Sequence, residues 1–514
     1  MTAPKEVELK LELPPASLPD LGKIPLVRAL EQRPKHATEV SVYFDTDTHK
    51  LRKHGVLLRV RRSGDHYVQT IKATGNGRLL ERDEWESEIA GETPDLDLAR
   101  GTVLEPLLSD KLRRQLKPVF ETRVRRTTYP LVNGTQAVVL TVDRGKIDTG
   151  ERSSPLCEIE LELEHGDEAV LFTVARELTQ ALPAKLALKS KSERGYELID
   201  DTLDAPVKAA PVELMPGTST RDGFKVIGHV CLRQIVGNEP ALLTGDPDGV
   251  HQLRVGVRRL RAAMSLFADI LDDRQTAAIK SELKWLAGEL APARELDVLM
   301  KRVVAPVRKR HARWDGVPAL TRDFTERREA ALARAQSAVK SARFRTLTLD
   351  IASWLETGEW ANPPDDLVRE RGDLPIEVTA AGELNRRFKK IRKRGKSLAE
   401  LPARARHKLR IQAKKVRYAA EFFAGVFPNK RAAKRRQKFL AALERLQDGL
   451  GDLNDIVVHE DLITALGVRR RPASRKRAFA AGVLAGHEDA RVDAAMAAAV
   501  DAYAELAKVK RFWR

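Results

Sequence analysis

Glutamates at alternate positions, near both ends of the first 200 residues, are the side chains best suited to chemistry. Glu6, Glu8 and Lys10 alternate along one segment, so on a β-strand all three would share a face. The segment CEIELELE has the same spacing in Glu158, Glu160, Glu162 and Glu164. Carboxylates on an inward face repel one another unless a cation lies among them, and hard oxygen ligands suit Mg²⁺ or Mn²⁺. We therefore expect a divalent-metal site, although a solvent-facing acidic edge strand would show the same alternation.

Basic side chains in the same half complement these glutamates. Arg59 and Arg61 lie two apart in LLRVRR, so they share a strand face and could hold one phosphate chain through bidentate hydrogen bonds. The candidate phosphate-binding and catalytic cations are Lys10, Arg59, Arg61, Lys72, Arg123, Arg126, Lys191 and Arg194. Arg123 and Arg126 have opposite parity on a regular strand, which weakens the assignment of Arg123. An interior lined by both signs of charge suits a polyanion that is bound together with a metal.

The elements that must position these residues are antiparallel strands. VELKLEL, GVLLRVRR, YVQTIK, EWESEIA, AVVLTVDRG and LCEIELELE alternate apolar with charged residues, which predicts a mostly β half. We expect a first domain over residues 1–203 and a proline-rich linker over 204–217. From residue 218 to 514 the apolar spacing becomes helical, which predicts an all-α second domain and an α+β chain of two domains.

The helical half contains an internal repeat. HQLRVGVRRLRAAMSLF begins at His251 and HKLRIQAKKVRYAAEFF at His407, 156 positions later, so we expect two similar helical bundles over about 218–370 and 375–514. Each copy places its cations on one helix face and its apolar residues on the opposite face. The stripe residues are His251, Arg254, Arg258 and Arg261 in the first copy and His407, Arg410, Lys414 and Arg417 in the second. The alternative is that each cationic helix face is simply solvated. Because like charges occur at the same positions in both copies, we favour binding of an extended anion.

Composition and charge narrow the class of protein. The chain has 514 residues and a formal net charge of +18. Residues 1–200 carry 31 basic and 33 acidic side chains, so the whole positive excess lies in residues 201–514. Such a field attracts polyanions, and because aromatic residues do not interleave with the cations, a phosphate polymer is favoured over nucleic acid. No membrane span or signal peptide is expected, and two cysteines indicate a reducing cytoplasm, with polyphosphate granules as an expected site of association.

The basic stripes resemble the CHAD domain, a helical domain named for its conserved histidine. The resemblance covers about residues 220–514 and rests on the HxLR start of each copy, the basic positions after it and the segment LAPARELDVL. It implies two helical repeats that bind inorganic polyphosphate in a basic groove. In the second copy Asn454 stands where the first has Arg294.

The β half is similar to the CYTH family of triphosphate tunnel metalloenzymes. The resemblance covers about residues 1–200 and rests on the ExExK of Glu6 to Lys10, Tyr43-Phe44-Asp45-Thr46 before LRVR, Lys72, Asp143, CEIELELE and KSERGY. It implies an eight-stranded antiparallel barrel whose tunnel binds a triphosphate with metal. The implied metal ligands are Glu6, Glu8, Asp143, Glu158, Glu160 and Glu162.

These inferences together predict a metal-dependent inorganic triphosphatase joined to a polyphosphate-binding module. The alternatives are a non-catalytic polyphosphate scaffold, or an enzyme for an organic triphosphate such as a thiamine triphosphatase or an adenylyl cyclase. No GxxxxGK[ST], GxSxG or HExxH motif occurs, so P-loop, serine-hydrolase and zincin chemistries have no support.

Overall fold

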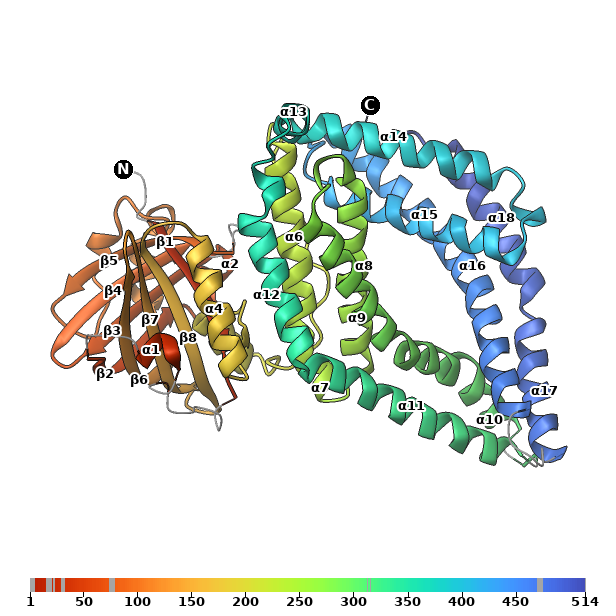
Figure 1. Cartoon of the computed structure of the whole chain (residues 1–514), viewed down its shortest axis with the longest axis horizontal. Coiled ribbons are helices and arrows are strands. Elements are labelled where there is room, and N and C mark those ends of the chain that lie inside the picture. The colour runs from red at the N-terminus through yellow and green to blue at the C-terminus, as the bar shows by residue number, and fades with distance from the viewer. Residues whose placement is uncertain are drawn as a thin grey trace. The chain divides into compact units, whose positions relative to one another are not determined.

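The computed structural model describes residues 5–14, 21, 24–28, 33–73, 79–311, 313–314, 316–468 and 475–513 (Figure 1). The chain forms two compact units. The first comprises Met1–Ala205 with Lys340–Gly358, and the second comprises Pro206–Val339 with Glu359–Arg514. In these described ranges no helix is long and apolar enough to cross a membrane.

The first unit is built on an antiparallel sheet, as the alternating segments predict. Its described strands are β1 (Lys5–Glu12), β2 (Lys35–Asp45), β3 (Val56–Ser63), β4 (His66–Ala73), β5 (Glu81–Ile89), β6 (Lys117–Asn133), β7 (Gln136–Asp148), β8 (Ser153–His165) and β9 (Lys185–Leu186). They lie in the order β5-β4-β3-β2-β6-β7-β8-β1-β9, and β1 also pairs with β5. The described residues thus form nine strands where eight were expected, because the two-residue β9 adds to the edge of β1.

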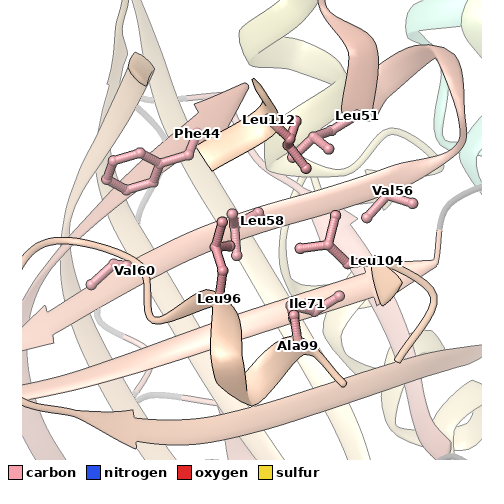
Figure 2. Close-up of a cluster of buried hydrophobic side chains, with 10 residues drawn as sticks. All are labelled: Phe44, Leu51, Val56, Leu58, Val60, Ile71, Leu96, Ala99, Leu104 and Leu112. Carbon is pink, nitrogen blue, oxygen red and sulfur yellow. The ribbon is translucent and has the colours of Figure 1, made fainter. Parts of the chain in front are cut away.

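Alternation along each strand separates an apolar face from a charged face. On β3 the side chains of Leu58 and Val60 are buried in an apolar cluster, whereas Arg59 between them takes the other face. The cluster gathers residues of β2, β3 and β4 with apolar residues of the segment 96–112 (Figure 2). Burial of each large apolar side chain contributes about 1.5–3 kcal/mol, so this face holds the strands in register.

The apolar face at β1 and β8 is covered by a helix instead. Helix α4 (Ala169–Ala181) packs against both strands, and Leu11, Ile159 and Leu161 there are fully buried. Helix α12 (Ala342–Thr357) packs against α4 and β9 and therefore belongs to the first unit, although it lies far along the chain. Its Asp350 pairs with Arg176 of α4 at 3.1 Å.

The short helix α5 (Lys191–Ile199) carries Lys191 into the sheet. Ser190 and Glu193 form a reciprocal capping box, which fixes Lys191 as the first helical residue. A Cβ at Gly195 would overlap the ring of Phe120 on β6, so only glycine allows this close approach. Three further short helices of the unit are α1 (Pro25–Arg28), α2 (Lys50–Lys53) and α3 (Asp110–Gln115).

The second unit is helical, as predicted. Its described helices are α6 (Thr220–Gly237), α7 (Glu239–Leu243), α8 (Pro247–Leu266), α9 (Arg274–Leu299), α10 (Ala305–Arg310), α11 (Val317–Lys340), α13 (Asp366–Asp373), α14 (Ile376–Gly395), α15 (Ala403–Phe422), α16 (Lys430–Val468), α17 (Arg475–Asp489) and α18 (Val492–Lys508). Helices α6, α8 and α9 pack in series, and α14, α15 and α16 repeat this arrangement.

The two helical repeats are tied together where they begin. Ser219, before α6, forms a β-bridge with Pro375, which lies 156 positions later and immediately before α14. The amide of Thr220 donates to the carbonyl of Leu374 at 2.8 Å. The amide of Ile376 donates to the carbonyl of Thr218 at 2.8 Å, which is the equivalent bond from the other copy, so the bridge itself is symmetric.

The segment over which we expected a linker, residues 204–217, is mostly packed on the second unit. The Asn238 side chain accepts from the amide of Val207 at 2.9 Å and donates to its carbonyl at 2.8 Å. Arg259 donates to the carbonyl of Ala210, and Val212 and Leu214 are buried.

We predict that Gly195→Ala destabilises the first unit by about 1–3 kcal/mol, because the new methyl group must displace either Phe120 or α5. Gly288→Ala in α9 is the matched control, since its Cβ meets open space and the lower backbone entropy of alanine stabilises a helix by about 0.5–1 kcal/mol. Thermal unfolding of the full chain measures both. A Gly195→Ala chain as stable as wild type would contradict the packing of α5.

Candidate functional site

The register of β1, β6, β7 and β8 brings charged side chains together on the charged face of the sheet. Asp143 of β7 lies opposite Arg126 of β6 and opposite Glu158 of β8. Glu160 of β8 lies opposite Lys10 of β1. Because directly opposite residues have Cβ atoms about 5 Å apart, neighbouring strands can present carboxylates and cations to one small volume.

Three carboxylates meet in this volume. Oxygens of Asp143, Glu158 and Glu160 all lie within 4.8 Å of one another. Lys191 reaches them from α5, with its Nζ 2.7 Å from Asp143, 2.5 Å from Glu158 and 3.0 Å from Glu160. Three hard oxygen donors at this spacing are a donor set that fits a divalent cation such as Mg²⁺ or Mn²⁺.

Two further cations form hydrogen bonds or ion pairs with carboxylates of this group. Arg126 donates to both oxygens of Asp143, at 2.8 and 2.6 Å, and to Glu160 at 3.1 Å. Lys10 lies 2.7 Å from Glu160 and 3.0 Å from Glu8. The carboxylates are therefore shared among three cations.

These contacts shift the pKa values of the carboxylates in opposite directions. Burial raises the pKa of Glu160, but the charges of Lys10, Lys191 and Arg126 outweigh burial and hold the pKa well below its usual range. For Glu158 burial is the larger effect and raises the pKa despite Lys191. A bound metal would add the positive charge that Glu158 still lacks.

A second charged group lies on β1, β3, β4 and β5, and the sequence analysis missed part of it. Lys72 Nζ lies 2.7 Å from Glu6 and 2.7 Å from Glu84 of β5. Arg59 lies 3.6 Å from Glu84, and Arg61 lies 3.2 Å from Glu86. The alternation of Glu84 and Glu86 in EWESEI was visible, but the pairing of β5 with β1, which brings them beside the ExExK segment, was not.

Glu162 lies between the two groups. Its side chain is exposed, yet partial desolvation raises its pKa, and the negative charges of Glu6, Glu8, Glu84 and Glu160 raise it further. Carboxylates that repel one another in this way attract a divalent cation.

Some candidate residues lie apart from both groups. Arg123 is exposed and pairs with Glu121 at 2.5 Å, as its opposite parity to Arg126 allows. Arg194 lies 3.5 Å from Glu12 and donates to the carbonyl of Pro155. Glu164 is exposed at the end of β8.

The basic stripes of the helical unit converge, because α8 and α15 pack against each other. Arg258 of α8 donates to the hydroxyl of Tyr418 on α15 at 3.4 Å. The buried Nε atoms of Arg254 and Arg410 have no hydrogen-bond partner within the part of the chain that the structure describes. His407 contacts Asn454 at 2.5 Å, and Arg261 is exposed near the end of α8.

Comparisons with known proteins agree with this division. The family model for the CYTH domain matches residues 4–196, and the model for the CHAD domain matches residues 227–464. The chain carries a CYTH domain followed by a CHAD domain.

One curated relative and one solved structure resemble these two domains. Over 198 residues, which make up 38% of its length, this chain is 30% identical to the inorganic triphosphatase of Haemophilus influenzae. The match spans 55% of that protein. The crystal structure of the CHAD domain from the plant Ricinus communis is 30% identical, with a TM-score of 0.51, and the similarity covers 60% of this chain and 98% of the plant chain.

Uncompensated positive charge is the chief electrostatic feature of the CHAD stripes. Burial and the charges of Arg410 and Arg258 lower the pKa of Lys414 to about 6. Burial and the charges of Arg294 and Arg258 lower the pKa of His251 to about 4. Acidic side chains near the stripes are Glu421, 3.4 Å from Arg417, Asp455, 3.7 Å from Arg410, and Glu295, whose charge acts on Arg254. The charges of Arg258, Arg410 and Arg294 still lower the pKa values of Lys414 and His251, so positive charge predominates there, which favours binding of an anion.

We predict that Lys414→Met raises the free energy of unfolding at pH 7, by about 1 kcal/mol, because it relieves folding of the cost of burying Lys414 and removing its proton. The folded-state pKa of Lys414 is depressed, so the unfolded chain binds the extra proton and wild-type stability rises as pH increases from about 6 towards 10. The gain should therefore shrink at high pH. Urea unfolding at pH 7 and pH 9.5 measures it, with the exposed Lys408→Met as control, and a less stable Lys414→Met chain would refute it.

Proposed function

We propose that the CYTH domain hydrolyses inorganic triphosphate with a divalent metal ion and that the CHAD domain binds polyphosphate. The observation that carries the first part is the group of Asp143, Glu158 and Glu160, with Lys10, Arg126 and Lys191 beside them. Carboxylates that could bind a metal ion and basic side chains that could bind phosphate therefore lie close together, which supports the proposal. The 30% identity to an inorganic triphosphatase over the CYTH part supports the same activity.

The pairing of β1 with β5 supports a closed interior. Residues 5–7 of β1 pair with residues 81–83 of β5, the strand at the opposite end of the sheet order. We propose that these pairings make the first eight strands a tunnel with its charged face inward. A tunnel would exclude bulk water and strengthen every contact with a bound triphosphate.

The residues of the tunnel divide into two roles. Asp143, Glu158, Glu160 and Glu162 would hold Mg²⁺ or Mn²⁺, and Glu6 and Glu8 extend this set. The bound ion would neutralise phosphate oxygens and lower the pKa of a water molecule.

The cations orient the substrate. Lys10, Arg126 and Lys191 would hold one part of the chain, and Arg59, Arg61 and Lys72 would hold the other, in line with the attacking water. Water adds to the terminal phosphorus, the bridging P–O bond breaks, and orthophosphate and diphosphate leave. Each cation would turn from its carboxylate to the substrate, since a bound metal would supply positive charge to the carboxylates.

The second part rests on the convergence of the α8 and α15 stripes. Arg254, Arg258 and Arg410 supply cations that the nearby carboxylates do not balance, and a bound anion would favour the protonated form of Lys414. A flexible chain with one charge per phosphate can meet them in sequence. Such binding would also associate the protein with polyphosphate granules in the cytoplasm.

We predict that Glu160→Gln lowers kcat on tripolyphosphate by about 100-fold or more and weakens Mn²⁺ binding, since it removes a ligand shared with Lys10 and Lys191. Glu164→Gln is the matched control on the same strand and should stay within about twofold of wild type. Phosphate release and Mn²⁺ titration measure the two effects. Equal activity of both variants would show that the carboxylate group is not the metal site, and a wild-type chain without activity would favour a scaffold.

We predict that changing Arg254 and Arg410 together to Glu weakens binding of long-chain polyphosphate by at least about tenfold. The dependence of log affinity on log salt should flatten by about 0.7–0.9 for each lost contact. The exposed pair Arg322→Glu and Arg371→Glu carries the same charge change away from the stripes and serves as control. Titration of the full chain in EDTA measures all three proteins. Equal losses in the two double variants would mean that net charge alone, and not the stripes, binds the polymer.

A further inference from the structure

The two copies of the stripe helix differ at one position that controls the charge around it. Glu421 of α15 is equivalent to Ser265 of α8, because both are the fifteenth residue counted from the histidine that begins each copy. By the same register Arg417 is equivalent to Arg261, and Arg259 is equivalent to Lys415. One copy therefore has a carboxylate where the other has a hydroxyl group.

In the second copy the carboxylate serves two cations. Glu421 Oε1 lies 3.4 Å from Nε of Arg417, one helical turn earlier. Burial raises the pKa of Glu421, and the charges of Arg417 and of Arg259, from α8, counteract this effect. Both arginines thus have a negative partner at this position.

In the first copy the equivalent position gathers cations without a carboxylate. Lys415 Nζ donates to Ser265 Oγ at 3.1 Å. Arg387 of α14 lies 3.4 Å from the same Oγ through its Nη2, which also donates to the Ser265 carbonyl. Two positively charged side chains therefore meet at one neutral hydroxyl group.

The surrounding charges do not compensate. Burial lowers the pKa of Lys415, and Arg387, Arg261 and Lys390 lower it further. Glu383, the carboxylate that pairs with Arg387, is already shared with Arg386. The charge of Asp269 acts on Arg387.

The cations also remain open to a ligand. Within the described ranges, Lys415, Arg261 and Lys390 have no carboxylate at ion-pair distance. Arg261 and Lys390 are exposed, and Ser265 and Lys415 are half-buried. An anion from solution can therefore reach the hydroxyl group and contact Lys415 and Arg261 without displacing an ion pair of either, while the buried Arg387 keeps its pair with Glu383 and contributes its charge nearby.

We propose that Ser265, Lys415, Arg387 and Arg261 form an anion site that binds one phosphoryl group of a polyphosphate chain. The phosphoryl oxygens take the place that the Glu421 carboxylate holds in the other copy. The site lies near the C-terminal end of α8, two turns beyond Arg258, so it extends the basic stripe. This inference rests on the proposed polyphosphate binding and adds a subsite that only one of the two repeats possesses.

The test is Ser265→Glu, which restores the carboxylate of the other copy, with Ser265→Gln as a control of equal size and no charge. Long-chain polyphosphate is titrated into the full chain in EDTA at several salt concentrations. Ser265→Glu should weaken binding by about tenfold and flatten the salt dependence by about one contact, while Ser265→Gln stays within about twofold. Without ligand, Ser265→Glu should raise the thermal midpoint by about 2–4 °C, because the new carboxylate neutralises Lys415 and Arg387.

Two results would overturn the subsite. Wild-type affinity of Ser265→Glu, or equal losses in the Glu and Gln variants, would show that no phosphoryl group binds at Ser265. The double variant of Arg254 and Arg410 in the same titration separates this failure from failure of the groove. If that variant loses affinity and Ser265→Glu does not, polyphosphate binds to the stripes but no phosphoryl group binds at Ser265.

Discussion

Burying many charges inside a sheet requires that each carboxylate faces a cation. An ionised group in a protein interior costs several kcal/mol unless it is paired, and Asp143 and Glu158 are almost completely buried. Lys191 satisfies both, and it reaches them because Gly195 lets α5 lie against Phe120. The apolar cluster on the other face of the sheet, in turn, holds the strands in the register that pairs the charges. In this domain the pairing of the buried charges therefore depends on the apolar packing that fixes the strand register.

In the CHAD domain the positive side chains of the stripes are not all paired with carboxylates. Helices α8 and α15 pack against each other, so the half-buried cations of the two copies lie close together, while Arg261 and His407 remain exposed. Burial lowers the pKa of Lys414, and the charges of Arg410 and Arg258 lower it further, so an anion bound there would favour the protonated lysine. The charged side chains of the CYTH domain are largely paired with one another, whereas the CHAD stripes hold cations that lower one another's pKa values.

Much of this architecture follows from local patterns. Alternation placed Glu8 and Lys10 on one face with Glu160, and the 156-residue repeat placed the histidines and arginines of two helices in register. Long-range pairing was beyond such patterns. Nothing local indicates that β5 pairs with β1, which brings Glu84 to Glu6, or that α12 packs on α4, because both depend on contacts between distant segments. The role of residues 206–214 was also hidden, since prolines indicate a loop but not its contacts with Asn238 and Arg259.

The central claim is that the carboxylate group of the CYTH domain acts through a divalent metal on an inorganic triphosphate. The most direct measurement is orthophosphate release from tripolyphosphate, ATP and thiamine triphosphate by the full chain in EDTA, and then after addition of Mg²⁺ or Mn²⁺. The account predicts no release in EDTA, release on addition of metal, and faster release from tripolyphosphate than from either organic triphosphate. Release that is unaffected by EDTA, or no release from tripolyphosphate with either metal, would contradict it.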